Sequence, residues 1–151
     1  MANTNYGINV NVNFNGVSYN ATTKTWSGTP TWTITPPSQG IPPVKAGTNT
    51  STITWSLHAA AQPQGFTASF AAPGVVMATG WTGGTPANTN STTCVASDNF
   101  NGLTANQVFE YVVTVTLANA DGTVSQNWDS DPDVINEAGT ANVCVLVHLR
   151  K

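Results

Sequence analysis

The sequence has few charged side chains. Four Lys and Arg and seven Asp and Glu are the only formally charged residues among 151, a fraction of 7%. Soluble domains typically have roughly 25%. Lys24, Lys45, Arg150 and Lys151 are scattered along the chain and form no basic patch that could neutralise a run of phosphates. The sequence therefore predicts that nucleic acid is not a partner.

Long hydrophobic runs are also missing. No window reaches the 18 or more apolar residues expected of a membrane span, so none is predicted. Residues 1–5 do not show a basic region followed by an apolar stretch, so no signal peptide is predicted either. With so little charge, the polar surface must be made from Asn, Thr and Ser. Because such surfaces are commoner on extracellular, cell-surface or virion proteins than on cytosolic enzymes, we expect one of those locations.

Cysteine is scarce as well. Cys94 and Cys144 are the two cysteines, and either they form one disulfide in an oxidising compartment or they are two small buried apolar side chains. The spacing leaves both alternatives open. A chain of this length removes roughly 68–70% of its unfolded surface from water, so a disulfide is not required for folding. The length predicts a single domain, residues 1–151.

Helical periodicity is absent, and alternation of apolar and polar residues takes its place. Residues 8–14 alternate Ile, Val, Val and Phe with Asn, which predicts a half-buried strand. Asn15-Gly16 predicts a tight hairpin leading into residues 17–21, and residues 80–92 are predicted to be a long loop. Further strands are predicted at 32–34, 53–57, 66–70, 75–77, 93–97, 109–117 and 141–149. Eight or nine short strands predict an all-β fold, a two-sheet antiparallel sandwich.

Two segments resemble the immunoglobulin fold. Residues 53–57, with Trp55 facing inward, resemble the strand that buries the central Trp of that fold. Residues 103–113 resemble the corner and strand in which a Tyr hydroxyl bonds back to upstream backbone. The resemblance covers residues 52–124, and it implies that the sandwich is immunoglobulin-like.

Acidic residues gather in one stretch, since five of the seven lie between Asp121 and Glu137. The run around Pro132 has the alternating oxygens of a loop wrapped around a hard cation such as calcium, which takes six to eight oxygens. The alternative is a solvated acidic turn that keeps a sheet edge from pairing. On a straight strand alternate carboxylates would lie about 6.8 Å apart and could not share an ion. The candidate calcium ligands are Asp129, Asp131, Asp133, Asn136 and Glu137.

The five tryptophans divide into two groups. Trp32 and Trp55 are in phase with neighbouring Ile residues and are predicted in the core. Trp26, Trp81 and Trp128 sit among Gly, Asn, Ser and Asp, which predicts loop positions. Loop indoles can stack on sugar rings or anchor an interface, or they can cap the open end of a sandwich against water. These three are the candidate ligand-binding residues.

Catalytic motifs are not recognisable. Cys144 and His148 are four residues apart on a predicted strand, which separates them by about 13 Å, too far to share one metal ion. No Gly-x-Ser-x-Gly nucleophile motif is present. We therefore expect no enzyme but a structural or protein-interaction domain that associates through a sheet edge, with residues 6–14 as the strand that pairs with another subunit. The alternative is a carbohydrate-binding module or lectin, which binds its sugar either with or without calcium.

Overall fold

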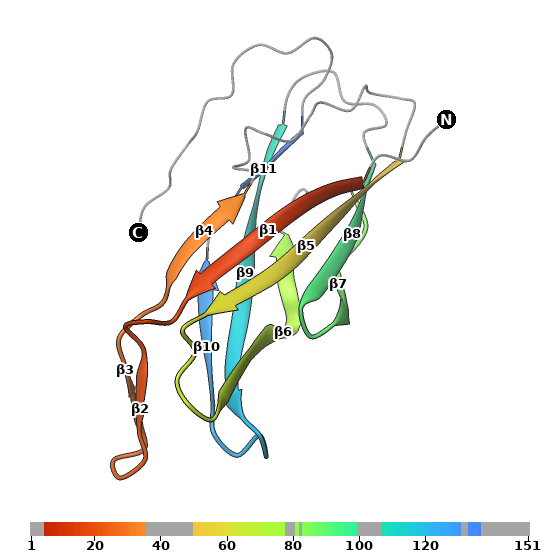
Figure 1. Cartoon of the computed structure of the whole chain (residues 1–151). Coiled ribbons are helices and arrows are strands. Elements are labelled where there is room, and N and C mark those ends of the chain that lie inside the picture. The colour runs from red at the N-terminus through yellow and green to blue at the C-terminus, as the bar shows by residue number, and fades with distance from the viewer. Residues whose placement is uncertain are drawn as a thin grey trace.

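The computed structural model describes residues 5–35, 50–77, 81, 83–99, 107–130 and 133–136, and every regular element in these ranges is a β-strand. The predicted all-β class is confirmed. No helix that could cross a membrane occurs in these ranges. The eleven strands, labelled in Figure 1, are β1 Asn5–Asn13, β2 Ser18–Asn20, β3 Thr25–Ser27, β4 Thr31–Thr35, β5 Thr50–Ala60, β6 Phe66–Met77, β7 Ala87–Asn90, β8 Thr93–Asn99, β9 Gln107–Asn119, β10 Ser125–Ser130 and β11 Asp133–Asn136.

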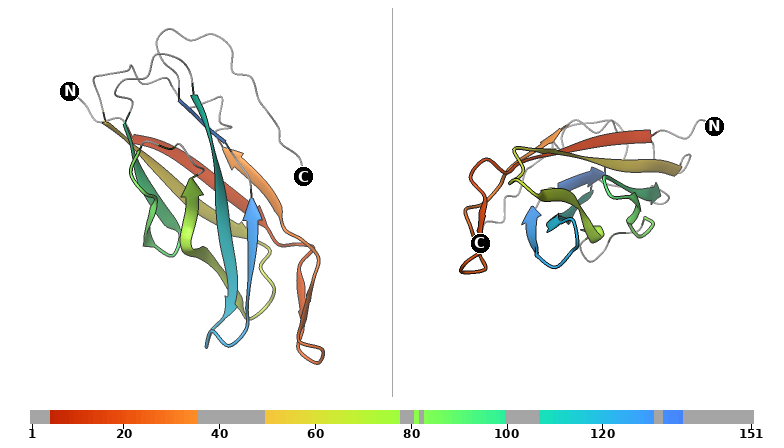
Figure 2. Two further views of the ribbon diagram at one scale, coloured as in Figure 1. Left: turned by 180° about the vertical axis from the view of Figure 1, so that it is seen from behind. Right: turned by 60° about the horizontal axis from the view of Figure 1, so that its bottom comes forward.

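Two large sheets and a small one are formed. The five-stranded sheet has the order β4-β1-β5-β8-β7. In the four-stranded sheet β9 is the central strand. β6 pairs with one side of β9, and β10 and β11 pair with successive parts of its other side. The third sheet is the β2–β3 hairpin, whose turn projects past the end of the five-stranded sheet (Figure 2).

The pairing of β1 with β5 is parallel, over the whole length from Asn5 opposite Thr52 to Asn13 opposite Ala60. The prediction of a purely antiparallel sandwich is wrong at this pair. The reason is the position of β4, which reverses the chain and pairs antiparallel with β1. The next strand, β5, runs again in the direction of β1 and takes its other side.

The predicted hairpin at Asn15-Gly16 is also wrong. Residues 14–17 do turn, because the Val17 amide donates to the Phe14 carbonyl at 2.9 Å. Neither Asn15 nor Gly16 has a positive φ, however, and β2 pairs with β3 instead of β1. Both sides of β1 are already occupied by β4 and β5, so no side is left for a hairpin partner.

One hydrophobic core lies between the two large sheets. The predicted alternation is confirmed for β1, β5 and β9, since their inward side chains are buried and the outward ones are not. Trp55 on β5 is fully buried, and its ring meets Tyr111 of β9 edge to face at 5.6 Å. The arrangement is sandwich-like. The core residues of these three strands are Ile8, Val10, Val12, Ile53, Trp55, Leu57, Tyr111, Val113, Val115 and Leu117.

Two strands differ from their predictions. β6 is a single strand where two short ones were predicted, and its pairing with β9 shifts register between Phe70 and Val75. Residues 87–90, predicted to be loop, form β7 and pair with β8. All four side chains of β7 are exposed, so an alternation of apolar and polar residues could not reveal it. The predicted strand at 141–149, with Cys144 and His148, lies outside the described residues.

Cys94 is a free thiol on β8 and is fully buried. Burial raises the pKa of this thiol to about 11, although backbone hydrogen bonds act in the opposite direction. Because the thiolate is the reactive form, Cys94 is a packing residue at neutral pH.

Candidate functional site

Trp26 and Trp128 are strand residues, so their predicted loop positions are wrong. Trp26 is the central residue of β3, opposite Tyr19 of β2, and Trp128 on β10 lies opposite Val115 of β9. Each of these two short strands has Trp as its one large apolar residue. A single apolar position contains no period, and this is why the sequence did not reveal the strands.

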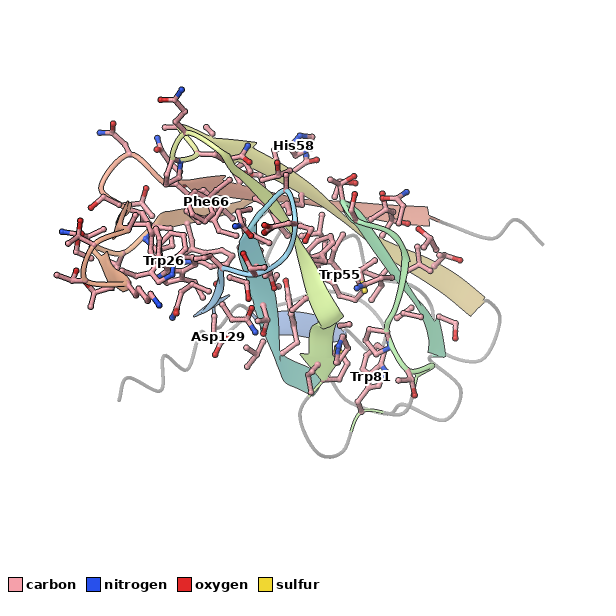
Figure 3. The ribbon with its side chains drawn as sticks, turned by 90° about the horizontal axis from the view of Figure 1, so that it is seen from below. Trp26, Trp55, His58, Phe66, Trp81 and Asp129 are labelled. Atoms are coloured by element: carbon pink, nitrogen blue, oxygen red, sulfur yellow. The ribbon has the colours of Figure 1, made fainter. Side chains whose placement is uncertain are left out.

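The two indoles belong to an aromatic cluster formed by Phe14, Tyr19, Trp26, Phe66 and Trp128. Trp26 packs edge to face on Phe66, with ring centroids 4.8 Å apart, and on Trp128 at 5.3 Å. Tyr19 contacts Trp26 at 5.0 Å, and Phe14 contacts Trp128 at 5.8 Å. The cluster joins the β2–β3 hairpin to β6, to β10 and to Phe14, which follows β1, and Figure 3 shows Trp26 beside Phe66. The contacts of Trp26 are therefore largely with protein, and ligand binding by Trp26 and Trp128 stays a prediction.

Trp81 lies apart from this cluster, on the other side of the molecule in Figure 3. Its side chain is half-buried, packs against the core, and donates a hydrogen bond from Nε1 to the Gly84 carbonyl at 2.9 Å. A Cβ at Gly83 would come within 2.2 Å of the indole ring, so glycine is needed there. The structure thus brings Trp26 and Trp128 together but not Trp81, whose binding role also stays a prediction.

The acidic segment is extended on both sides of residues 131–132. Asp129 on β10 lies opposite Thr114, and Asp133 on β11 lies opposite Glu110, four residues away along β9. That offset corresponds to about 13 Å of strand. Asp129 is exposed and accepts a hydrogen bond from Thr114 Oγ1 at 2.7 Å.

The calcium site is only partly within the described chain. Asp131 and Glu137 lie outside it, and for Asp133 and Asn136 only the backbone is described. Among the residues that the structure describes, no three His, Cys, Asp or Glu side chains gather closely enough to hold a metal ion. Calcium binding at this segment stays a prediction.

The fifth acid, Asp121, serves the turn between β9 and β10. In this turn the Gly122 amide donates to the Asn119 carbonyl at 3.0 Å. Thr123 donates to the Asp121 carboxylate from Oγ1 at 2.7 Å and from its backbone amide at 3.0 Å. These two hydrogen bonds lower the pKa of Asp121, the hydroxyl having the larger effect.

The strand predicted to pair with another subunit is not at an edge. Residues 9–13 of β1 have β4 on one side and β5 on the other, so this part of the strand has no free side for the predicted addition to another subunit's sheet edge. Within the described ranges, the edges of this sheet are β4 and β7. β7 is tied to β6 by Asn88, which donates to the Ala71 carbonyl at 2.5 Å and accepts from the Gly74 amide at 3.2 Å. Among the described residues, no side-chain hydrogen bond joins the other edge strand, β4, to the second sheet.

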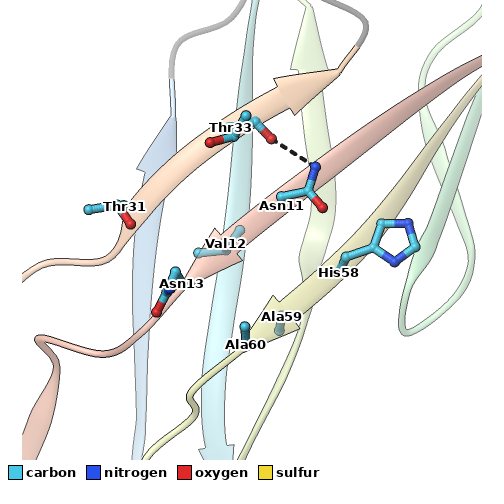
Figure 4. A pocket seen from close by; sticks show the side chains of 8 residues that line it. All are labelled: Asn11, Val12, Asn13, Thr31, Thr33, His58, Ala59 and Ala60. Carbon is cyan, nitrogen blue, oxygen red and sulfur yellow. Dashed lines mark hydrogen bonds between the residues drawn. The ribbon is translucent and has the colours of Figure 1, made fainter.

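A groove of about 350 Å³ lies on the outer face of β4, β1 and β5. We call it the outer groove; its outward-facing side chains are Asn11, Asn13, Thr31, Thr33, His58 and Ala60 (Figure 4). None of these side chains is Lys, Arg, Asp or Glu. Alternation in the sequence marks them only as solvent-facing. Their juxtaposition depends on the parallel β1–β5 pairing, which the sequence did not reveal.

No protein-family model matches the chain, and no curated protein or solved structure was found to match it. The function of the chain is therefore inferred from its own strands and side chains.

Proposed function

We propose that this chain is a non-catalytic structural or protein-interaction domain, residues 1–151, which self-associates through the edge strand β4. The observation that carries this proposal is the sequence of that strand, Thr-Trp-Thr-Ile-Thr. Protein edge strands are usually protected by Lys, Pro, bulges or inward-pointing charges. β4 has none of these residues, consists of types that favour strands, and pairs with β1 alone among the described residues.

Two-fold pairing of β4 with β4 of a second copy fits its sequence. In an antiparallel pair centred on Thr33, Thr31 would lie opposite Thr35 of the second copy, and Trp32 opposite Ile34. Trp32 and Ile34 are half-buried against the core, so pairing would cover apolar surface that is still exposed. Because a two-fold interface uses the same patch on both chains, the assembly closes as a dimer and does not grow into a fibre.

The strand order supports an immunoglobulin-like architecture for this domain. If β5 to β10 are taken as strands B to G, the order β1-β5-β8-β7 corresponds to A-B-E-D and the order β6-β9-β10 to C-F-G. Three features depart from that pattern. β4 is an additional edge strand, β1 is parallel to β5, and the buried Trp55 lies on the strand equivalent to B instead of C.

The environments of two reactive residue types favour a role without catalysis. Burial holds the pKa of Cys94 at about 11, so its nucleophilic thiolate is not formed at neutral pH. His58 Nε2 contacts Asn9 Oδ1 at 3.1 Å. A catalytic triad instead has a carboxylate that holds the imidazole in place, and His58 has an amide in that position.

The proposal is tested by the solution mass of the wild-type chain and of charge variants of β4, measured by light scattering coupled to size-exclusion chromatography. The wild type is expected to have the mass of two chains. Thr31→Lys/Thr35→Lys places like charges opposite each other across the proposed two-fold axis and should give monomers. Thr31→Lys/Thr35→Glu places opposite charges there and should restore the dimer.

Thr22→Lys/Ala120→Lys is the matched control, because it adds the same charge at exposed turn positions away from β4. It should remain dimeric. A wild-type chain that is monomeric at the highest soluble concentration would contradict self-association. A dimer unaffected by lysines at positions 31 and 35 would show that β4 is not the interface.

A further inference from the structure

We propose that the outer groove binds a neutral oligosaccharide. This function goes beyond self-association and uses different atoms. Self-association would use the backbone edge of β4, whereas the groove is formed by side chains on the outer face of the sheet.

The register of three strands arranges the lining as a grid. Thr33, Asn11 and His58 form one row across β4, β1 and β5. Thr31, Asn13 and Ala60 form the second row. The rows are about 6.8 Å apart, and each row spans about 9.5 Å, given the usual spacings within and between strands. A sugar ring fits between four neighbouring side chains of the two rows, and two linked rings fit along the rows.

Ala60 gives the grid its depth. It is the only lining residue whose side chain ends at Cβ among the six that face outward, so the surface is lowest between Asn13 and His58. Figure 4 shows the imidazole of His58 standing at the border of this low area. A ligand lying over Ala60 would therefore have polar side chains beside it on β1 and β5.

Hydrogen-bonding groups in the groove are not all used within the protein. Asn11 Nδ2 donates to the Thr33 carbonyl at 3.2 Å, and Asn13 Oδ1 accepts from the Asn15 amide at 2.9 Å. The hydroxyls of Thr31 and Thr33, Asn11 Oδ1 and Asn13 Nδ2 have no partner among the described residues. Since Asn9 Oδ1 can only accept, His58 Nε2 donates to it, and Nδ1 is the ring nitrogen that this hydrogen bond does not use.

This mixture of donors and acceptors fits a neutral polyhydroxylated ligand. A sugar hydroxyl both donates and accepts, so neighbouring hydroxyls can match an amide oxygen, an amide nitrogen and a threonine hydroxyl together. The lining has no charge to attract an acidic or basic ligand. An extended peptide lying in the groove over β1 could not pair with its backbone, because this part of β1 is paired on both sides. The observations therefore favour a neutral sugar over a peptide or a charged glycan.

The affinity is expected to be low, in the millimolar range. Trp32, the aromatic residue of β4, is on the opposite face of that strand from Thr31 and Thr33, so no indole lines the groove to stack on a sugar ring. Binding depends on hydrogen bonds, each with a modest net contribution in water.

The experiment is a titration of the ¹⁵N-labelled full chain with cellohexaose, xylohexaose, maltohexaose and fully N-acetylated chitohexaose, followed by amide chemical shifts. At least one of the four is expected to shift the amides of residues 11–13, 31–33 and 58–60. Asn13→Ala removes one donor and should weaken binding about two- to tenfold, the equivalent of one hydrogen bond. Ala60→Leu fills the low area without removing a polar group and should abolish binding.

Asn127→Ala is the matched control, because Asn127 lies on the outer face of the other sheet. It should bind as the wild type does, and dispersed spectra would show that each variant is folded. Four sugars without effect, shifts confined to the surroundings of Trp81 or Trp128, or wild-type binding by Ala60→Leu would each overturn the proposal. Tighter binding of hexagalacturonate than of any neutral sugar would overturn its neutrality.

Discussion

The outer faces of the two large sheets are made of similar residues, but the hydroxyl groups on the two faces differ in whether they have hydrogen-bond partners. On the face of β9 and β10, Thr114 Oγ1 donates to Asp129 and Thr116 Oγ1 donates to Asn127 Oδ1, both at 2.7 Å. On the face of β4, β1 and β5, the hydroxyls of Thr31 and Thr33 have no such partner among the described residues. Composition alone therefore does not decide whether a polar face can bind. The cross-strand pairing of its donors and acceptors decides this.

The largest loss of stability is expected from a change at a core residue that both sheets share. Trp55→Ala leaves a cavity in the core shared by the two sheets and should lower the free energy of unfolding by about 3–5 kcal/mol. Urea denaturation followed by far-UV circular dichroism measures this loss. Because both sheets pack on Trp55 or its contact Tyr111, they should unfold in one transition. A loss below about 1 kcal/mol would mean that Trp55 is not central to the core.

A smaller loss of stability is expected when hydrogen bonds are removed only from the outer face of β9 and β10. Thr114→Val/Thr116→Val removes two cross-strand hydrogen bonds but keeps the side-chain shape. The free energy of unfolding should fall by about 1 kcal/mol, because the acceptors Asp129 and Asn127 are exposed and each bond contributes modestly. The same urea titration provides the value. No change beyond experimental error would mean that the two bonds do not stabilise this face.

The turn that joins β9 to β10 also has internal side-chain hydrogen bonds, and their contribution to stability depends on pH. Since hydrogen bonds from Thr123 lower the pKa of Asp121 in the folded chain, its contribution to stability is present above the unfolded-state pKa. The contribution is lost as pH falls through the folded-state pKa. Asp121→Asn should therefore reduce the drop in melting temperature between about pH 5 and about pH 2, and leave a flatter profile than the wild type. An identical acid profile in the variant would contradict this role.

Side-chain alternation was enough to predict the all-β class and the buried faces of the long strands. Val10, Trp55 and Val113 each lie in a long strand, where the alternation of apolar and polar residues repeats several times. Short strands are too short for such repetition. β3, β7 and β10 were missed because they have one large apolar residue or none. The order of strands could not be predicted, since alternation reports which face a residue occupies and not which strand lies beside it.

The same limit explains the outer groove. Asn13 and His58 are 45 positions apart in the chain and are joined only by the parallel pairing of β1 with β5. The three candidate indoles had a detectable signal, their isolation among polar residues. That signal did not distinguish an exposed ring from one packed in an aromatic cluster, because the partners Tyr19 and Phe66 come from other strands.

The central claim is that the outer face of β4, β1 and β5 keeps hydrogen-bonding groups that the other face uses internally. Thr31→Val/Thr33→Val tests it most directly, because it makes the same chemical change as Thr114→Val/Thr116→Val on the other sheet. In urea titrations, the free energy of unfolding should stay within about 0.3 kcal/mol of the wild type, since no intramolecular side-chain bond is lost. A loss as large as that of the Thr114 and Thr116 double variant would contradict the claim.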